Sequence, residues 1–262
     1  MDLQLRGKVA VVVAASKGLG KASALELARE GASVAICSRS DLIEATASEI
    51  RAETGSEVLA VQADVKNPAD IERLIACAIE KFNKIDILVI NAGGPPPGEF
   101  LSFQPDDWEA AIQLTLMSAV RLCYATVPHM LDRGSGAIVA IESISVKQPV
   151  DNLILSNSIR MAVIGLLKSM ANELGPKGIR INSINPTFTW TERVEQLLKN
   201  RAKANETDID EEAAKIAITI PLQRMGKVEE FGRAVAWLAS PAASYIHGHA
   251  LMFDGGATKS PL

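Results

Sequence analysis

The regular alternation of short apolar runs with longer amphipathic stretches constrains the fold of this chain most strongly. The short runs are rich in β-branched residues and too short for helices, so each predicts a buried strand. The predicted strands are Lys8–Ala14, Ser33–Cys37, Val58–Gln62, Ile85–Ile90, Gly136–Ile141, Ile179–Asn185 and Ala250–Phe253. The helices predicted between them are Gly18–Glu30, Asp41–Glu53, Asn67–Phe82, Asp106–Arg133, Ser156–Leu174 and Val228–Ala239.

This order of elements predicts an α/β fold with a doubly wound parallel sheet of the Rossmann type. Strands that alternate with helices are joined by right-handed crossovers, which place helices on both faces of the sheet. No break in composition divides the chain, so we expect residues 1–262 to form a single domain. Ligands of such sheets bind beyond the carboxyl ends of the strands. The loops after the strands are therefore where function is expected.

Composition narrows the classes of function. With 48% hydrophobic residues, a net charge of −4 and a pI near 5.5, the chain has the profile of a globular protein and no basic face for nucleic acid. The spacing of Cys37, Cys77 and Cys123 matches no metal motif and predicts three buried thiols in a reducing compartment. The longest apolar run, Val9–Ala15, is far below the ~18 residues that cross a bilayer. We expect a cytoplasmic protein that binds neither membrane, nucleic acid nor metal.

The loop after the first predicted strand contains the first candidate binding site. Ser16-Lys17-Gly18-Leu19-Gly20 joins a strand to a helix, which is the context that a dinucleotide-binding loop requires. Gly18 and Gly20 allow backbone N–H groups and the helix N-terminus to approach a pyrophosphate. Two glycines that only ease a tight turn are the alternative interpretation of the loop alone.

A series of motifs in the same order along the chain resembles the short-chain dehydrogenase/reductase family, in particular its 3-oxoacyl-(acyl-carrier-protein) reductases. The family loop T-G-x-x-x-G-x-G is matched at both final glycines, whereas Val13 and Ala14 replace the usual Thr and Gly. The remaining matches are Asp64-Val65, Asn91-Ala92-Gly93, Trp108, Ser143, Asn185-Pro186 with Thr191, Pro221–Gly226 and Asp254-Gly255-Gly256.

The resemblance implies a nicotinamide dinucleotide and assigns roles to several loops. Asp64, followed by Val65, would hold the adenine, and Asn91-Ala92-Gly93 would line the ribose. Pro186 and Thr191 would lie at the nicotinamide.

The residues after the second predicted strand bear on the choice of cofactor. An acidic residue there would bind the ribose 2′-hydroxyl of NAD, but this chain has Ser38 and Arg39 instead. Arg39 and Lys17 can pair with a 2′-phosphate and Ser38 can donate to it. We therefore expect NADP(H) rather than NAD(H); solvated surface charges are the alternative.

The catalytic pattern of the family is altered in this chain. The family uses a Ser, a Tyr, a Lys one helical turn later and an Asn in the long helix, and the matching positions hold Ser143, Ser156, Arg160 and Thr115. An aliphatic hydroxyl is a much weaker acid than a phenol, and Arg keeps its proton. Arg160 can still bind the nicotinamide ribose or clamp a carboxylate or phosphate.

Three functions remain open at this point. The chain can be a reductase acting on a ketone or secondary alcohol with non-standard proton chemistry. It can be an NADP(H)-binding protein without turnover, with a regulatory role. It can also be a lyase or isomerase on the same scaffold. A purely structural role for the altered pair is a further alternative, with Ser156 as a helix N-cap and Arg160 paired with Glu173 or with a carboxylate of another chain.

The substrate and the assembly are less constrained. Residues 187–220 form the substrate lid in relatives, and here Phe188 and Trp190 can face a small-molecule ligand while the remainder is highly charged. The stretch 93–98 contains three prolines and can form either a substrate wall or a rigid surface connection. Relatives are usually homotetramers, and Asp106–Arg133 and Ser156–Leu174 are apolar enough to pair between chains. We expect Pro128 to kink or shorten the first of these helices.

Overall fold

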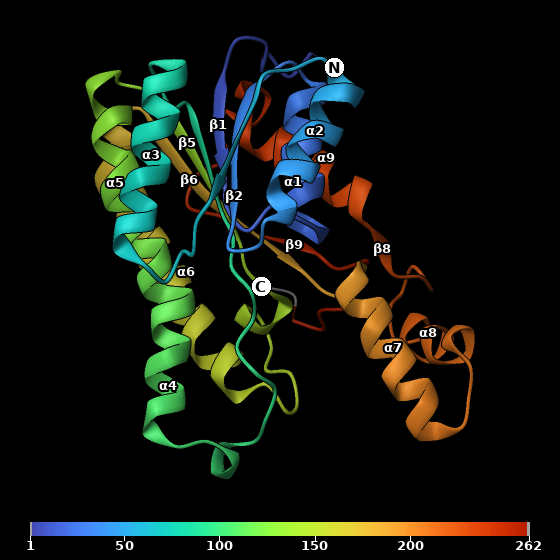
Figure 1. Ribbon diagram of the computed structural model, residues 1–262. Helices are drawn as coiled ribbons and strands as arrows, with labels where there is room; N and C mark the ends of the chain where they lie inside the picture. Colours follow the sequence, from blue (N-terminus) through green and yellow to red (C-terminus); the bar gives the residue numbers. More distant parts are fainter. Residues whose placement is uncertain (1, 261–262) are drawn as a thin grey trace.

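A seven-stranded, fully parallel sheet forms the centre of the molecule (Figure 1). The structure is a computed structural model that describes residues 2–260. The strand order is β3-β2-β1-β4-β5-β6-β9. The strands are β1 (Val9–Val12), β2 (Ser33–Ser38), β3 (Val58–Gln62), β4 (Ile87–Ile90), β5 (Gly136–Ile141), β6 (Ile179–Pro186) and β9 (Ala250–Phe253). The predicted doubly wound α/β fold is confirmed, with each predicted strand present within a few residues of its expected bounds.

Helices cover both faces of this sheet, so that it is buried on both sides (Figure 1). One face carries α1 (Gly18–Arg29), α2 (Leu42–Thr54) and α9 (Val228–Ala239). The other face carries α3 (Pro68–Phe82), α5 (Ser118–Asp132) and α6 (Ile154–Leu174). Burial on both faces explains why the strands are continuous apolar runs rather than alternating ones.

The topology creates a crevice at the carboxyl ends of the neighbouring strands β1 and β4. The chain runs outward through β1, β2 and β3, then returns to the other side of β1, which pairs with both β2 and β4. The loops after β1 and β4 therefore leave the sheet in opposite directions. Nδ2 of Asn91, after β4, donates to the Ala14 carbonyl after β1 at 3.2 Å. This contact holds the two loops together at the switch point, where open α/β sheets bind ligands.

The long helix before β5 is interrupted, although not at Pro128, where a kink or an early end was predicted. It consists of α4 (Pro105–Ile112), a π-helical turn at Gln113–Met117 and α5, which continues through Pro128 without a break. The wider π turn, rather than the proline, is the irregularity in this stretch. Such turns often occur at functional sites, and this one contains Thr115.

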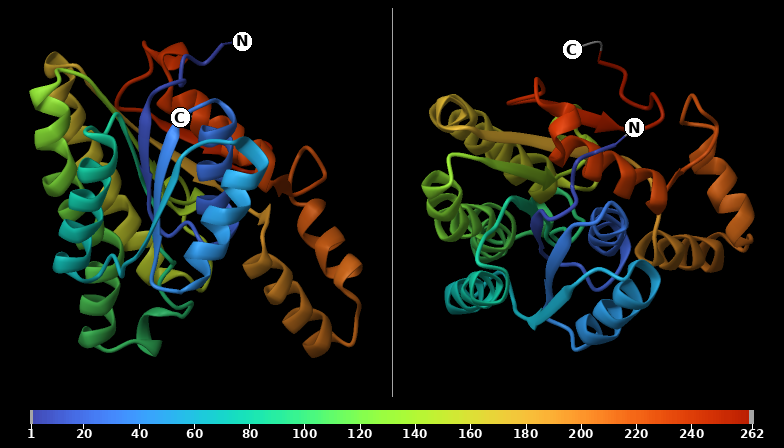
Figure 2. Two further views of the ribbon diagram at one scale, coloured as in Figure 1. Left: turned by 45° about the horizontal axis from the view of Figure 1, so that its top comes forward. Right: turned by 90° about the horizontal axis from the view of Figure 1, so that it is seen from above.

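Residues 187–220, the predicted lid, form two helices that project from the sheet (Figure 2). After the short strand β7 (Thr189–Trp190), which pairs with β8 (Gly226–Lys227), come α7 (Glu192–Asn205) and α8 (Ile209–Ala217). A small separate core joins the two helices; its buried members are Leu198, Ile216, Ile220 and Met225. Phe188, expected to face a ligand, packs against this core.

Two findings qualify the expectations from composition. By length and composition alone, Pro105–Asp132 and Ile154–Lys177 would suffice to cross a membrane, which is weak evidence because core helices pass the same test. Both belong to helices that pack on the sheet. Cys37 and Cys123 are buried free thiols as predicted, but Cys77 is only half-buried. Burial raises the pKa of both buried thiols to about 12.

Candidate functional site

The turn after β1 is tight and leaves backbone groups facing the crevice. Gly18 has a positive φ of 58°, and a methyl group on Gly20 would lie 2.9 Å from Nδ2 of Asn91 and closer still to the Ala14 carbonyl oxygen. Only glycine fits at residue 20, and α1 begins directly at this turn. The N-terminus of α1, where N–H groups lack intrahelical partners, is thereby open to an anion.

Ala14 departs from the glycine usual in the family and has a left-handed backbone, with a φ of 51°. This conformation is costly for a residue with a Cβ. The cost of this replacement therefore lies in the backbone of the turn.

Two cations lie beside this turn without an acidic partner. The Ala15 N–H donates to the Cys37 carbonyl at 2.9 Å, which ties the glycine turn to the end of β2. Lys17 and Arg39 are both exposed, and neither is in an ion pair within residues 2–260. Because β2 ends in Ser38 rather than a carboxylate, this corner is suited to an anion. The Ser38 hydroxyl itself donates to the Ser40 carbonyl at 2.9 Å and also accepts from the Ser40 N–H.

The other predicted cofactor residues lie at the same edge of the sheet. Oδ1 of Asp64 accepts from the Lys66 N–H at 2.9 Å, which fixes the carboxylate beyond β3, and Val65 is buried next to it. The Ser16 carbonyl accepts from Thr46 Oγ1, and Leu19 packs into the core beneath α1. The predicted residues that complete the edge are Ala92 and Gly93 after β4 and Pro186 at the end of β6.

The first turn of the lid lies over the glycine turn. Thr191 caps α7, with its Oγ1 accepting from the Val194 N–H at 3.3 Å. Its Cγ2 lies 3.6 Å from the position that a Cβ of Gly18 would take. Similarly, Nη1 of Arg193 lies 3.2 Å from the position of a Cβ on Gly94, in the loop after β4. The lid therefore contacts both loops that border the crevice.

The proline-containing loop is held against the start of α6. The Gly98 N–H donates to the Asn152 carbonyl at 2.8 Å, and the Ile154 N–H donates back to Gly98. Loop and helix thus form one wall, which favours the interpretation of this loop as part of the pocket.

The residues at the predicted catalytic positions are brought together by β5, α6 and the π turn. Ser143 follows β5, and its Oγ accepts from the Ser145 N–H at 3.2 Å. Ser156 and Arg160 lie one turn apart on α6, with Arg160 Nε donating to Ser156 Oγ at 3.2 Å. Thr115 is buried in the π turn, which packs on α6, and its hydroxyl has no partner within residues 2–260.

The structure also shows a residue that sequence reasoning missed. Glu142 lies directly after β5, and its Oε2 accepts from Nη1 of Arg160 at 2.9 Å in a buried ion pair. Burial raises the pKa of the Glu142 carboxyl above its ordinary value, and the contact with Arg160 offsets only part of that rise. The available signal was an acidic residue immediately after an apolar strand.

This pair corrects two expectations about α6. Arg160 pairs with Glu142 and not with Glu173. Ser156 is not an N-cap, because the helix already begins at Ile154 and Leu153 occupies the capping position. The hydroxyl of Ser156 lies inside the first turn and faces Arg160 instead.

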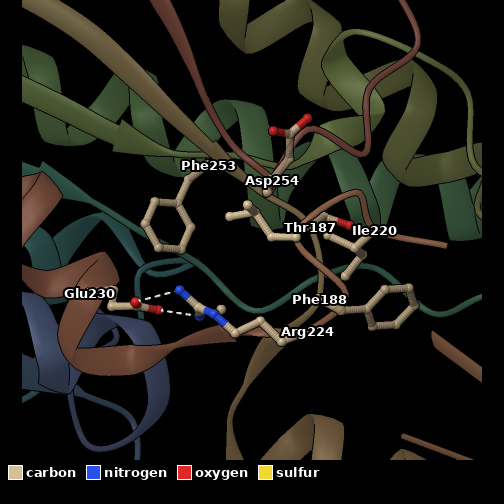
Figure 3. Close-up of a pocket in the computed structure, with 10 residues that line it drawn as sticks. Thr187, Phe188, Ile220, Arg224, Glu230, Phe253 and Asp254 are labelled. Atoms are coloured by element: carbon tan, nitrogen blue, oxygen red, sulfur yellow. Dashed lines mark hydrogen bonds and ion pairs between the residues drawn. The ribbon is translucent and has the colours of Figure 1, made fainter. Parts of the chain in front are cut away.

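Two clefts adjoin the lid. The first, of about 160 Å³, lies between the lid and β9 and has Phe188 and Phe253 in its wall. Figure 3 shows these residues and, at one side, the bidentate ion pair from Arg224 to Glu230. The second, of about 330 Å³, separates α1 from the lid and includes Gly18 and the half-exposed Trp190. Within the described residues, no cluster of His, Cys, Asp and Glu is arranged to hold a metal ion.

Comparison with known proteins agrees with this geometry. The profile of the family described as enoyl-(acyl carrier protein) reductase matches residues 13–258. The 3-oxoacyl-[acyl-carrier-protein] reductase of Synechocystis is 36% identical over 256 residues, covering 96% of this chain and 97% of the relative. Oxidoreductase UcpA of Salmonella typhimurium is 34% identical, covering 97% and 96%.

Among solved structures, the L-sorbose reductase of Gluconobacter frateurii in complex with NADPH and L-sorbose superposes with a TM-score of 0.96. It is 32% identical and covers 99% of this chain and all of its own. The chain therefore belongs to the short-chain dehydrogenase/reductase family, a class of Rossmann-fold oxidoreductases.

Proposed function

We propose that this chain is an NADP(H)-dependent oxidoreductase that acts on a ketone or secondary alcohol of a small molecule. The observation that carries the proposal is the corner formed by the glycine turn, Lys17 and Arg39. Neither cation has an ion-pair partner among residues 2–260, and β2 ends in Ser38 rather than in a carboxylate. A 2′-phosphate placed there gains charge-assisted hydrogen bonds. The NADPH complexes of the L-sorbose reductase and of an actinorhodin polyketide ketoreductase support the same cofactor.

The fit of the cofactor is supported along the whole carboxyl edge. Lys17, Arg39 and Ser38 would hold the 2′-phosphate, and the N-terminus of α1 with Gly18 and Gly20 would hold the pyrophosphate. Asp64 would bind the adenine. Asn91 to Gly93, Pro186 and Thr191 would enclose the ribose and nicotinamide. The bound cofactor supplies or accepts the hydride.

The residues of the chain would orient the carbonyl and manage its proton. Ser143 places a hydroxyl directly after β5, and Ser156 places one in the first turn of α6. Both would bind the substrate oxygen. Ser156 accepts from Arg160, so its own proton is available for donation to that oxygen. Because serine is a weak acid, the net proton would come from water, and the buried Thr115 hydroxyl, which has no partner within residues 2–260, would bind an internal water molecule.

One observation favours NADP(H) binding without turnover as a second candidate function. Tyr124 and Tyr245 are 79% and 100% exposed, and they lie on α5 and before β9, so neither supplies a phenol to the site. The strongest acid of the family pattern therefore has no substitute among the residues described. A regulatory protein would need only the cofactor site.

A turnover assay separates the two candidates. Protein that binds NADPH is incubated with a panel of ketones, and with alcohols and NADP⁺ in the reverse direction, while cofactor absorbance is followed. We expect oxidation of NADPH with at least one ketone. Binding without turnover across the panel would favour the second function.

The double change Ser156→Tyr with Arg160→Lys is the matched control. If the parent chemistry uses Ser156 and Arg160, this variant gains little over the parent. Reduction that appears only in the variant would show that the parent is not a reductase.

The surroundings of the site complete the proposal. Residues 187–220 would act as a lid, since α7 contacts the glycine turn at Gly18 and the loop at Gly94.

We further propose a cytoplasmic homotetramer without a nucleic-acid, membrane or metal partner.

A further inference from the structure

Glu142 and Arg160 form a buried ion pair beside the candidate site. The side chains are only 3% and 9% exposed, and Oε2 of Glu142 lies 2.9 Å from Nη1 of Arg160. The two residues are 18 positions apart in sequence, so β5 and α6 must be packed in register to bring them together. Within residues 2–260 no other ion pair includes either side chain.

The donors of Arg160 are unevenly used. Its Nε donates to Ser156 at 3.2 Å, and its Nη1 donates to Glu142 and, at 3.4 Å, to the Ile141 carbonyl. Within residues 2–260, Nη2 makes no hydrogen bond, and it is not among the buried atoms without partners, so this edge of the guanidinium keeps some contact with solvent. Arg160 therefore retains donors for a ligand, although Glu142 balances its positive charge.

Stability alone explains this pair poorly. Two charges removed from water recover their desolvation cost only with good geometry, and apolar replacements of a buried ion pair are often neutral or stabilising. The chain nevertheless buries a carboxylate behind an arginine at a position bordering the pocket.

Buried polar atoms that carry no charge also lie near the pair. The unpartnered buried polar atoms nearby in the fold are Thr115 Oγ1 in the π turn, Ser145 Oγ after β5 and Asn185 Oδ1 near the end of β6. Ile184 pairs with Ile141, so Asn185 and Glu142 follow at matching positions of neighbouring strands. Buried polar atoms without partners point to water or an uncharged polar ligand.

We infer that Glu142 is a positioning residue that also sets the substrate class: it holds Arg160 beside Ser156 and cancels its charge, so that the pocket binds an uncharged carbonyl or hydroxyl oxygen rather than a carboxylate or phosphate. The inference rests on the proposed function, because it concerns the same pocket. It also removes Arg160 from the cations available to an anionic substrate.

Removal of the Glu142 charge tests the inference. Protein is titrated by calorimetry with benzoate and with its uncharged analogue benzamide, in the presence and absence of NADPH. The parent is expected to bind benzamide at least as tightly as benzoate. In Glu142→Gln, the freed guanidinium should bind benzoate at least about tenfold more tightly than in the parent, since a bidentate carboxylate contact becomes available. Benzamide binding should change less than twofold.

Matched variants separate this role from a general effect. The double variant Glu142→Gln with Arg160→Met should lose the gain in benzoate binding. Glu211→Gln, at an exposed acidic residue of α8, should behave as the parent. Thermal unfolding of each variant shows which ones are folded, because loss of one partner of a buried pair is destabilising.

The outcomes that overturn the inference are distinct from failure of the proposed function. Unchanged benzoate affinity in folded Glu142→Gln contradicts the inference. If that variant does not fold, the parent alone decides. Binding of benzoate at least tenfold more tightly than benzamide contradicts the inference, and binding of benzamide at least as tightly as benzoate supports it. If the parent does not bind NADPH, the proposed function is contradicted instead. The comparison of benzoate with benzamide in the absence of NADPH still tests the inference in that case.

Discussion

Arg39 is the residue on which the preference for a phosphorylated cofactor depends most directly. It is exposed, lies beyond β2 and has no acidic partner among the residues described. A hydrogen bond to a charged group contributes about 1.5–3 kcal/mol, which corresponds to roughly tenfold to hundredfold in affinity. We expect Arg39→Ala to weaken NADPH binding by that factor and to leave NADH binding unchanged, as measured by fluorescence titration.

The control for this prediction is Arg233→Ala. Arg233 is an exposed arginine on α9, outside the loops that follow the strands. Equal losses of NADPH and NADH affinity in Arg39→Ala would contradict a specific contact with the phosphate.

Ala14 provides a second prediction at the scale of the residue. Its left-handed φ of 51° disfavours any side chain with a Cβ. Glycine removes this strain, although it also increases the entropy of the unfolded chain. We expect Ala14→Gly to raise the free energy of unfolding by about 1 kcal/mol, measured by urea denaturation. Lower stability of the variant would show that the local conformation is not strained.

Individual side-chain partners were the least predictable part of the site. The cofactor-loop residues could be placed from sequence because each follows a strand whose end is fixed by the sheet. Glu142 could not, because its contact with Arg160 depends on how α6 packs on β5. For the same reason the alternative of Ser156 as an N-cap does not hold: the helix starts at Ile154, before this first polar residue of the helix.

At the scale of elements, the strands were predictable because burial on both faces makes them continuous apolar runs. The π turn was not, since the sequence at Gln113–Met117 has the same helical spacing as its neighbours. The bounds of α7 and α8 were also obscure, because charged residues dominate 192–212 and only a few apolar residues face inward.

Glu212 fastens the two lid helices to each other. Its Oε1 accepts from Asn205, Thr207 and Lys215, at 3.1, 2.8 and 2.6 Å. The hydrogen bond from Lys215, followed by those from Asn205 and Thr207, lowers the pKa of Glu212 to about 2, from an ordinary value of 4.5. A carboxyl group whose pKa is lower in the folded protein stabilises the fold at any pH above its pKa in the unfolded chain. For Glu212, this contribution is lost as the pH falls from about 4.5 to about 2.

We therefore expect the parent to melt at a higher temperature than Glu212→Gln at pH 6, and the difference to shrink as pH falls below about 4.5. Thermal unfolding of both proteins across this range measures the effect. A difference in melting temperature that stays constant down to pH 3 would contradict the role of the ionised carboxylate.

At the scale of the whole molecule, each of the two long helices carries an exposed apolar side chain. Tyr124 on α5 and Met161 on α6 are 79% and 48% exposed, on the two long helices predicted to pair between chains. We expect a homotetramer, with a mass by light scattering of about four times the 27.9 kDa of the chain. Tyr124→Glu should shift this species to smaller ones, whereas Lys177→Glu, in the short helix after α6, should not. A monomer in the parent protein would contradict the expectation.

The central claim is that the carboxyl edge of the sheet binds a phosphorylated nicotinamide dinucleotide. The most direct test is calorimetric titration of the purified protein with NADPH and with NADH under identical conditions. We expect NADPH to bind at least about tenfold more tightly, as a single contact of Arg39 with the phosphate would produce. Equal affinity for the two nucleotides, or no binding of either at millimolar concentration, would contradict the claim.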